Sequence, residues 1–81
     1  MYKTKVFFKT LTDVKEFVDI AAKYDDLEIN LISDIYTINA HSIIGILSLD
    51  ISAPIELEIP TGPIPESFYD DISRYLWENN S

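Results

Sequence analysis

The residues most able to do chemistry stand side by side at His41 and Ser42. His41 is the only histidine and the chain has no cysteine, so a dedicated zinc site is not expected. An imidazole can still act as a nucleophile, so His41 is a candidate for covalent chemistry. Ser42 precedes an apolar segment, and serine is a favoured N-cap because its hydroxyl accepts a backbone N–H two or three residues later. We therefore expect a short helix from Ile43.

The position of Ser42 is also physically compatible with a phosphate. A phosphate at a helix N-terminus meets free N–H groups and the positive end of the helix dipole, which is favourable by roughly 0.3–1 kcal/mol. A serine that only caps the helix has the same sequence pattern, so both interpretations remain open.

The predicted short helix is unusually aliphatic for its length. Helical spacing groups its apolar residues into two sets: Ile43, Ile44 and Leu47 on one side, and Ile46, Leu49 and Ile51 elsewhere. Residue type alone favours burial of all of them. The alternative is that Ile43, Ile44 and Leu47 form an apolar patch for a protein partner beside Ser42.

Composition narrows the classes of partner. The 81 residues predict one domain over residues 1–81, and 47% hydrophobic residues are enough for a core. There are 14 acidic and 6 basic residues, giving a net charge of −8, so nucleic acid and anionic membranes are poor partners. No apolar run approaches a membrane span, no secretory signal is evident, and we expect a cytoplasmic protein. The sequence suggests no cofactor and no metal.

Hydrophobic periodicity predicts strand, helix, strand, strand, helix, strand and helix in that order. The expected elements are strands at 2–9, 27–32, 35–40 and 55–59, a first helix opened by a capping box of Asp13 with Glu16, the short helix from Ile43, and a last helix from Pro65 to Trp77. The residues Asn79–Ser81 are expected to fray. No strand is apolar on both sides, so the helices should cover one face of an antiparallel sheet. Adjacent carboxylates at Asp25–Asp26 and Asp70–Asp71 are interpreted as surface charge.

The open face of this sheet should carry Lys3 and Lys5 together with Glu28, Asn30, Glu56 and Glu58. If the first and last strands are neighbours, the lysines lie across from glutamates. The same first six elements also fit a ferredoxin-like split βαβ fold, which would favour a small-molecule sensor. Periodicity does not separate these two architectures.

The residues 37–49 read Thr-Ile-Asn-Ala-His-Ser-Ile-Ile-Gly-Ile-Leu-Ser-Leu. This segment resembles the region around the regulatory serine of HPr, the histidine-containing phosphocarrier of the bacterial sugar phosphotransferase system. Gram-positive members read much like Thr-Val-Asn-Leu-Lys-Ser-Ile-Met-Gly-Val-Met-Ser-Leu there. The resemblance implies an α+β fold: the HPr-like open-faced β-sandwich, βαββαβα, with a four-stranded antiparallel sheet and three helices on one face.

The resemblance also implies where the family's phosphoacceptor histidine should lie. HPr carries it after the first strand, in a Gly-x-His-x-Arg-Pro type loop at the head of the first long helix. Here the corresponding stretch is Lys9-Thr10-Leu11-Thr12-Asp13-Val14, which has no histidine, glycine, arginine or proline. A threonine phosphate is a stable ester and does not replace a phosphoimidazole. The resemblance thus implies a divergent member without the phosphoacceptor histidine.

The leading hypothesis is a non-enzymatic binding or regulatory module that acts through the Ser42 helix. The implied partners are proteins, either of the phosphotransferase system or transcription regulators. In the family, the serine at the position of Ser42 is phosphorylated from ATP by a dedicated kinase, so the resemblance implies that Ser42 is a candidate site of regulatory phosphorylation. The apolar face corresponding to Ile43, Ile44 and Leu47 meets partner proteins in the family. The alternatives are a working phosphocarrier that uses His41 and the ferredoxin-like sensor.

Overall fold

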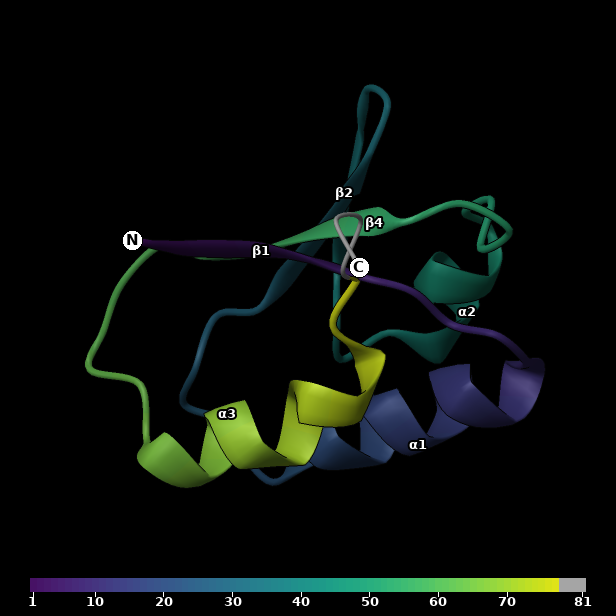
Figure 1. Cartoon of the computed structure of the whole chain (residues 1–81). Helices are drawn as coiled ribbons and strands as arrows, with labels where there is room; N and C mark the ends of the chain where they lie inside the picture. The colour runs from purple at the N-terminus through teal and green to yellow at the C-terminus, as the bar shows by residue number, and fades with distance from the viewer. Residues whose placement is uncertain (78–81) are drawn as a thin grey trace.

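The computed structural model describes residues 1–77. The elements in chain order are β1 (Tyr2–Val6), α1 (Leu11–Ala22), β2 (Asn30–Ser33), β3 (Tyr36–Asn39), α2 (Ile43–Leu47), β4 (Ile55–Ile59), α3 (Glu66–Ile72) and a 3₁₀ turn, η1 (Ser73–Tyr75). Figure 1 shows the sheet above α1 and α3. The predicted order of elements is confirmed, although the first three strands are shorter than predicted. The expected fraying of Asn79–Ser81 lies outside the described residues.

The four strands form one antiparallel sheet in the order β1-β4-β2-β3. β1 therefore lies at one edge and β3 at the other, with β2 and β3 joined as the predicted hairpin. In a ferredoxin-like sheet the first strand would be interior. The ferredoxin-like alternative is therefore wrong for this chain, and the strand order is the one expected for HPr.

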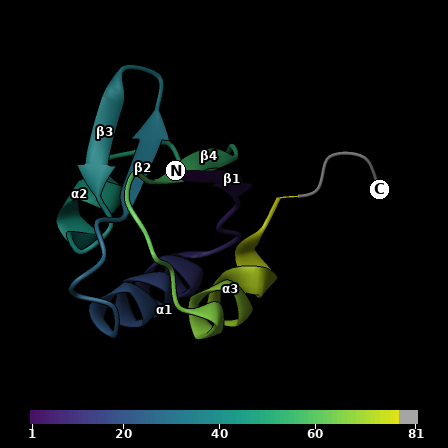
Figure 2. The same cartoon turned by 90° about the vertical axis from the view of Figure 1, so that its left-hand side faces the viewer.

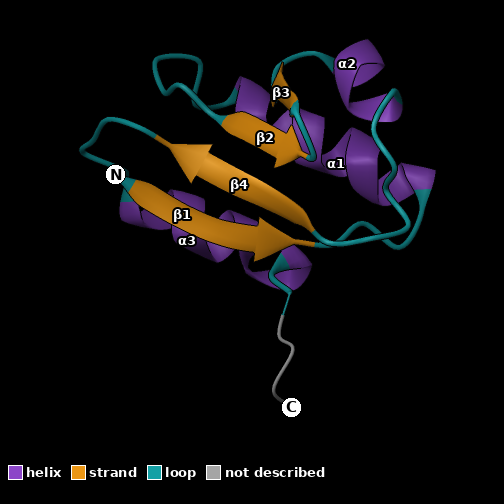
Figure 3. Ribbon diagram, turned by 90° about the horizontal axis from the view of Figure 1, so that it is seen from above, coloured by secondary structure: helices purple, strands orange, loops and turns teal. Residues whose placement is uncertain are grey.

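The helices lie together on one face of the sheet, as Figures 2 and 3 show from two directions. The other face is open and polar. On it Lys3 Nζ lies 3.7 Å from a Glu56 carboxylate oxygen and 3.8 Å from one of Glu58, while Asn30 donates a 3.0 Å hydrogen bond to Glu28. The predicted alternation of this sheet is confirmed.

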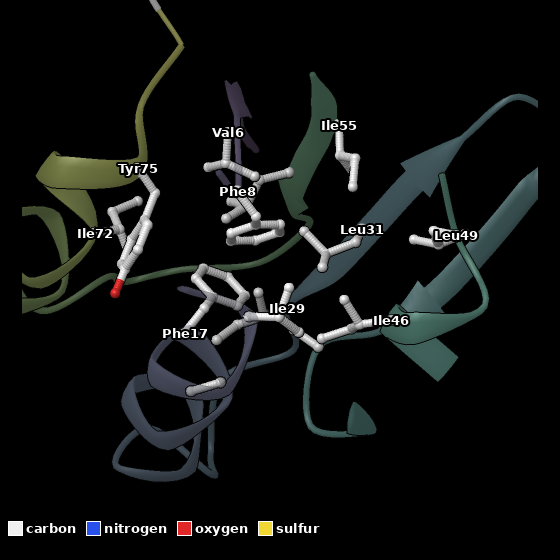
Figure 4. Packing of buried hydrophobic residues seen from close by; sticks show 14 of the residues in the cluster. Val6, Phe8, Phe17, Ile29, Leu31, Ile46, Leu49, Ile55, Ile72 and Tyr75 are labelled. Atoms are coloured by element: carbon white, nitrogen blue, oxygen red, sulfur yellow. The ribbon is translucent and has the colours of Figure 1, made fainter. Parts of the chain in front are cut away.

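The core fills the space between the sheet and the helices. Strand β4 contributes Ile55, Leu57 and Ile59, all buried, because its side chains alternate between the helix face and the open face. In Figure 4 the rings of Phe8 and Phe17 lie among residues from β2 and α2; their centroids are 5.2 Å apart.

The first helix starts differently from the prediction. Its N-cap is Thr10, whose hydroxyl accepts the Asp13 backbone N–H at 3.2 Å, while the Asp13 carboxylate accepts the Lys9 backbone N–H at 3.0 Å. The reciprocal pair is therefore Thr10 with Asp13, and the predicted capping box of Asp13 with Glu16 is wrong. Both Thr10 and Asp13 are cap-forming types, and only the backbone path decides between them.

The last helix ends earlier than predicted. α3 stops at Ile72, η1 follows, and Leu76 leaves the helix to form a bridge with Val6. Backbone hydrogen bonds from Phe7 N to Tyr75 O and from Trp77 N to Lys5 O, both 2.8 Å, fix this segment along the outer edge of β1. The helical spacing predicted up to Trp77 is overridden by this pairing, because the edge of β1 offers backbone partners to the chain.

Candidate functional site

Ser42 caps α2 as predicted. Its backbone is extended, with φ −110° and ψ 102°, and its hydroxyl oxygen accepts the Gly45 backbone N–H at 3.1 Å. The residue is exposed, so the hydroxyl is reachable from solvent. The Ser42 backbone N–H donates to Asn39 O at 3.0 Å, which fixes the turn between β3 and α2.

Gly45 is required where α2 lies against β3. A Cβ built on Gly45 would lie 2.6 Å from Ile38 Cγ2 and 3.2 Å from Ser42 Oγ. The 2.6 Å distance is closer than a Cβ tolerates and the 3.2 Å distance is tight, so the glycine allows the close approach of helix to strand. The helix stays short, ending at Leu47 with Ser48 as its C-cap.

The aliphatic residues of α2 separate into the two sets that helical spacing gives. Ile46 is fully buried, whereas the exposed fractions are 37% for Ile43, 80% for Ile44 and 48% for Leu47. Leu49 is also buried. The simpler interpretation, in which the whole segment is core, is wrong, because a short helix lying on a sheet has only one face to bury. We call the surface of Ile43, Ile44 and Leu47 the α2 patch.

His41 does not lie at the start of α1. Its ring Nε2 lies 3.3 Å from Leu27 O, and its backbone N–H donates to Asn39 Oδ1 at 2.7 Å. Leu27 belongs to the segment after the C-terminal end of α1, while the Thr10 loop lies at the other end of that 12-residue helix, about 18 Å away along its axis. The imidazole is therefore tied to a backbone carbonyl, away from the loop in which the resemblance places the phosphoacceptor.

The fold brings one arginine close to the start of α1 from a distant part of the sequence. Arg74 Nη2, just after α3, lies 3.3 Å from Glu16 Oε1 and 4.0 Å from Asp13 Oδ1. Arg74 could not be assigned to this place from the sequence, because it lies about sixty residues from the Thr10 loop along the chain. The guanidinium faces two carboxylates, so an incoming phosphoryl group would also meet Asp13 and Glu16.

Tyr75 completes this group of side chains. It is buried, its ring packs against Phe8 and Phe17, and its hydroxyl donates to Glu16 Oε1 at 3.1 Å. Burial, together with the bond to the Glu16 carboxylate, raises the pKa of Tyr75 to about 12. The phenol therefore stays protonated at neutral pH and serves as a structural donor.

The paired carboxylates have different roles in the structure. Asp25 and Asp26 are exposed, in agreement with their interpretation as surface charge. Asp71 is partly buried and accepts the Tyr24 hydroxyl at 2.6 Å and the Lys23 ammonium at 3.0 Å, which joins α3 to the end of α1. The Tyr24 hydrogen bond and the Lys23 ion pair lower the pKa of Asp71. Asp71 thus has a structural role that the sequence did not reveal.

A pocket of about 370 Å³ lies next to this junction and includes none of the predicted site residues. Its walls come from the residues after α1 and from the loop before α3: Lys23, Tyr24, Asp25, Asp26, Leu27, Thr61, Gly62, Pro63 and Pro65. Within residues 1–77, no three His, Cys, Asp or Glu side chains come together as metal ligands. Every helix in the same range is too short or too polar to cross a bilayer.

The strand order, the helices on one face and the serine-capped α2 define an HPr-like open-faced β-sandwich. A solved structure with a similar fold is described as HPr-C-His from Thermoanaerobacter tengcongensis. The two chains share 25% sequence identity with a TM-score of 0.73, over 91% of this chain and 89% of the other. No protein-family model and no curated protein matches the sequence. The fold of this chain is therefore similar to that of an HPr.

Proposed function

We propose that this chain is a binding or regulatory module related to the bacterial sugar phosphotransferase system, and that it is not a phosphocarrier. The observation that carries the proposal is a combination of two features in one chain: the α2 patch is exposed, and the start of α1 has no imidazole. The module is not an enzyme, requires no cofactor, and works in the cytoplasm. Its partners are proteins of the phosphotransferase system or transcription regulators.

The start of α1 is poorly suited to phosphoryl transfer. Thr10 and Asp13 use their side chains to cap the helix, and Arg74 is engaged by Asp13 and Glu16. A phosphoryl group there would find hydroxyls and carboxylates in place of a nucleophilic ring and a free guanidinium. Negative charge at this surface would also repel it.

The α2 patch is suited to contact with a protein. Three aliphatic side chains are partly or largely exposed around the exposed hydroxyl of Ser42, where apolar burial on binding would be favourable. Phosphorylation of Ser42 would place about two negative charges at the border of this patch, next to the N–H groups of α2. A phosphate there would be compatible with the helix and would change the binding surface without requiring a change of fold.

Whether the chain accepts a phosphoryl group is tested by incubating it with phosphoenolpyruvate and the first enzyme of the phosphotransferase system. We expect no stoichiometric acid-labile phosphate, with a conventional HPr as the positive control. The rival hypothesis, a carrier that uses His41, predicts labelling that disappears in His41→Ala. Labelling of the unaltered protein would overturn the non-carrier proposal whichever residue carries the phosphate.

The regulatory hypothesis is tested with ATP and an HPr kinase. We expect phosphate on Ser42 and none in Ser42→Ala, with the modified protein changing its affinity for a phosphotransferase or transcription-regulator partner. Ile44→Glu should abolish that binding, while the matched control Ile35→Glu, which alters an exposed isoleucine at the far hairpin, should retain it. Equal binding by both variants would rule out the α2 patch as the contact surface.

A further inference from the structure

Within residues 1–77, no strand pairs with the outer edge of β3, and of its outward backbone groups only the Asn39 carbonyl is engaged, by the Ser42 N–H at 3.0 Å. Ala40 N donates to Ile29 O at 2.8 Å, and hydrogen-bonded pairs alternate along an antiparallel ladder, so Ile38 and Tyr36 also bond toward β2. Thr37 and Asn39 therefore direct their backbone N–H groups away from the sheet. An edge of this kind is a template for another strand.

The two edges of the sheet differ in how they are protected. Residues 75–77 cover the outer edge of β1 through the hydrogen bonds to Lys5 and Phe7. β3 has no proline, lysine or other charged residue within Tyr36–Asn39, which are the usual means of blocking an edge. Ile35 and Tyr36 are 89% and 60% exposed, so apolar surface accompanies the open edge.

The charge distribution indicates what kind of strand this edge accepts. The chain carries a net charge of −8, yet no Asp, Glu, Lys or Arg occurs from Ile35 to Leu49. That segment contains β3 and α2, which lie side by side at one end of the molecule in Figures 2 and 3. A second copy can approach there without setting carboxylates directly against carboxylates, whereas elsewhere the acidic surface opposes self-association.

We propose that β3 pairs antiparallel with β3 of a second copy, about a two-fold axis at Thr37, to form a continuous eight-stranded sheet. In this register the two Thr37 residues exchange backbone hydrogen bonds. Each Tyr36 then lies opposite the other copy's Ile38, an aromatic and β-branched pair of the kind that stabilises neighbouring strands. Ile35 lies opposite Asn39 of the second copy. This pairing uses the backbone of β3, whereas the proposed partner contact uses the side chains of the α2 patch.

The short edge and the net charge set the expected behaviour of the dimer. A four-residue strand offers few hydrogen bonds, so association should appear at high micromolar to millimolar protein. The two copies repel each other through charges outside the interface, and salt screens that repulsion. Dimerisation should therefore strengthen from about 0.01 M to about 1 M salt, over which the screening length falls from about 30 Å to about 3 Å.

The experiment is analytical ultracentrifugation of the full chain over a concentration series at both salt levels. Thr37→Pro removes the outward N–H without touching the bonds to β2, and should weaken the dimer at least about tenfold, because the two hydrogen bonds at the axis are lost. Thr37→Val keeps the N–H and serves as the matched control, with the dimer retained. Should Thr37→Pro not fold, Tyr36→Lys introduces a charge at the exposed edge and should have the same effect.

Amide hydrogen exchange locates the interface independently. The Thr37 N–H should exchange more slowly as protein concentration rises, whereas the N–H of exposed Ile44 should not change. A monomer at millimolar protein in about 1 M salt would overturn the proposal. So would a dimer that survives Thr37→Pro and is lost in Ile44→Glu, because that result would place the contact on the α2 patch.

Discussion

The backbone N–H of Gly45 points at the hydroxyl oxygen of Ser42 from 3.1 Å, and the same glycine allows α2 to lie against Ile38 of β3. Capping and packing at this helix therefore depend on one another. Gly45→Ala should destabilise the protein by about 1–2 kcal/mol, because the clash with Ile38 outweighs the gain of about 1 kcal/mol in helix propensity. Urea unfolding measures this. Gly62→Ala is the matched control: its Cβ would meet Ile64 N at an ordinary 3.7 Å, and little change is expected.

Removing the Ser42 hydroxyl should cost about 1 kcal/mol of unfolding free energy, the usual effect of losing an N-cap side chain. Ser42→Asn and Ser42→Asp keep an acceptor for the Gly45 N–H and should restore most of the loss. Chemical denaturation of the four proteins gives the comparison. If Ser42→Ala were as stable as the unaltered chain, the cap would contribute nothing to stability. Phosphorylation would then be the one proposed role left for Ser42.

Neighbouring isoleucines of α2 should respond very differently to truncation. Ile46→Ala creates a cavity beneath the helix and should cost about 2–5 kcal/mol, whereas Ile44→Ala should lie within about 0.5 kcal/mol of the unaltered protein. Thermal or urea unfolding of the pair provides the measurement. Equal losses would show that Ile44 is packed in solution and would remove the α2 patch.

Alkaline pH should weaken the fold through Tyr75. Its pKa is raised from 10.0 to about 12, so the folded state retains the phenol proton after the unfolded state has lost it. The stabilisation is complete below about pH 10 and is lost between about pH 10 and 12, an effect of the order of 2 to 3 kcal/mol. Between about pH 10 and 12, the free energy of unfolding should fall more steeply with pH for the unaltered chain than for Tyr75→Phe. In the folded protein, one of the five tyrosines should ionise late by ultraviolet absorbance.

Acid should loosen the contact between α1 and α3 through Asp71. The hydrogen bond from Tyr24 and the ion pair with Lys23 lower its pKa below the ordinary 3.8. This stabilisation is present above the ordinary pKa and is lost as pH falls through the lowered value. Asp71→Asn should flatten the acid limb of a stability–pH profile. The control is Asp70→Asn, since within residues 1–77 the Asp70 carboxylate is exposed and makes no ion pair. Identical acid limbs for both variants would contradict this assignment.

Local sequence patterns predicted most of the fold. The two-residue alternation of β4 follows from burial on a single side, which periodicity reports directly. The division of α2 into buried and exposed sides was available from the same reasoning. The end of α3 was not, because Leu76 leaves the helix to pair with Val6, and such a contact has no local signature.

The contacts around the candidate site were harder to predict from the sequence for the same reason. Arg74 reaches Asp13 and Glu16 across about sixty residues of sequence, and Tyr24 reaches Asp71 across 47. The absence of a histidine near Thr10 could be read from the sequence alone. That Arg74 lies beside Asp13 and Glu16 could be seen only in the three-dimensional structure.

The pairing of β1 with β4 joins segments that are far apart in the sequence, since the paired residues are separated by 49 to 57 positions. In the β2–β3 hairpin the paired residues are only 3 to 9 positions apart. Closing the longer loop costs more chain entropy and is slower. We therefore expect the hairpin to form first and β1 to join the sheet in a late step of folding.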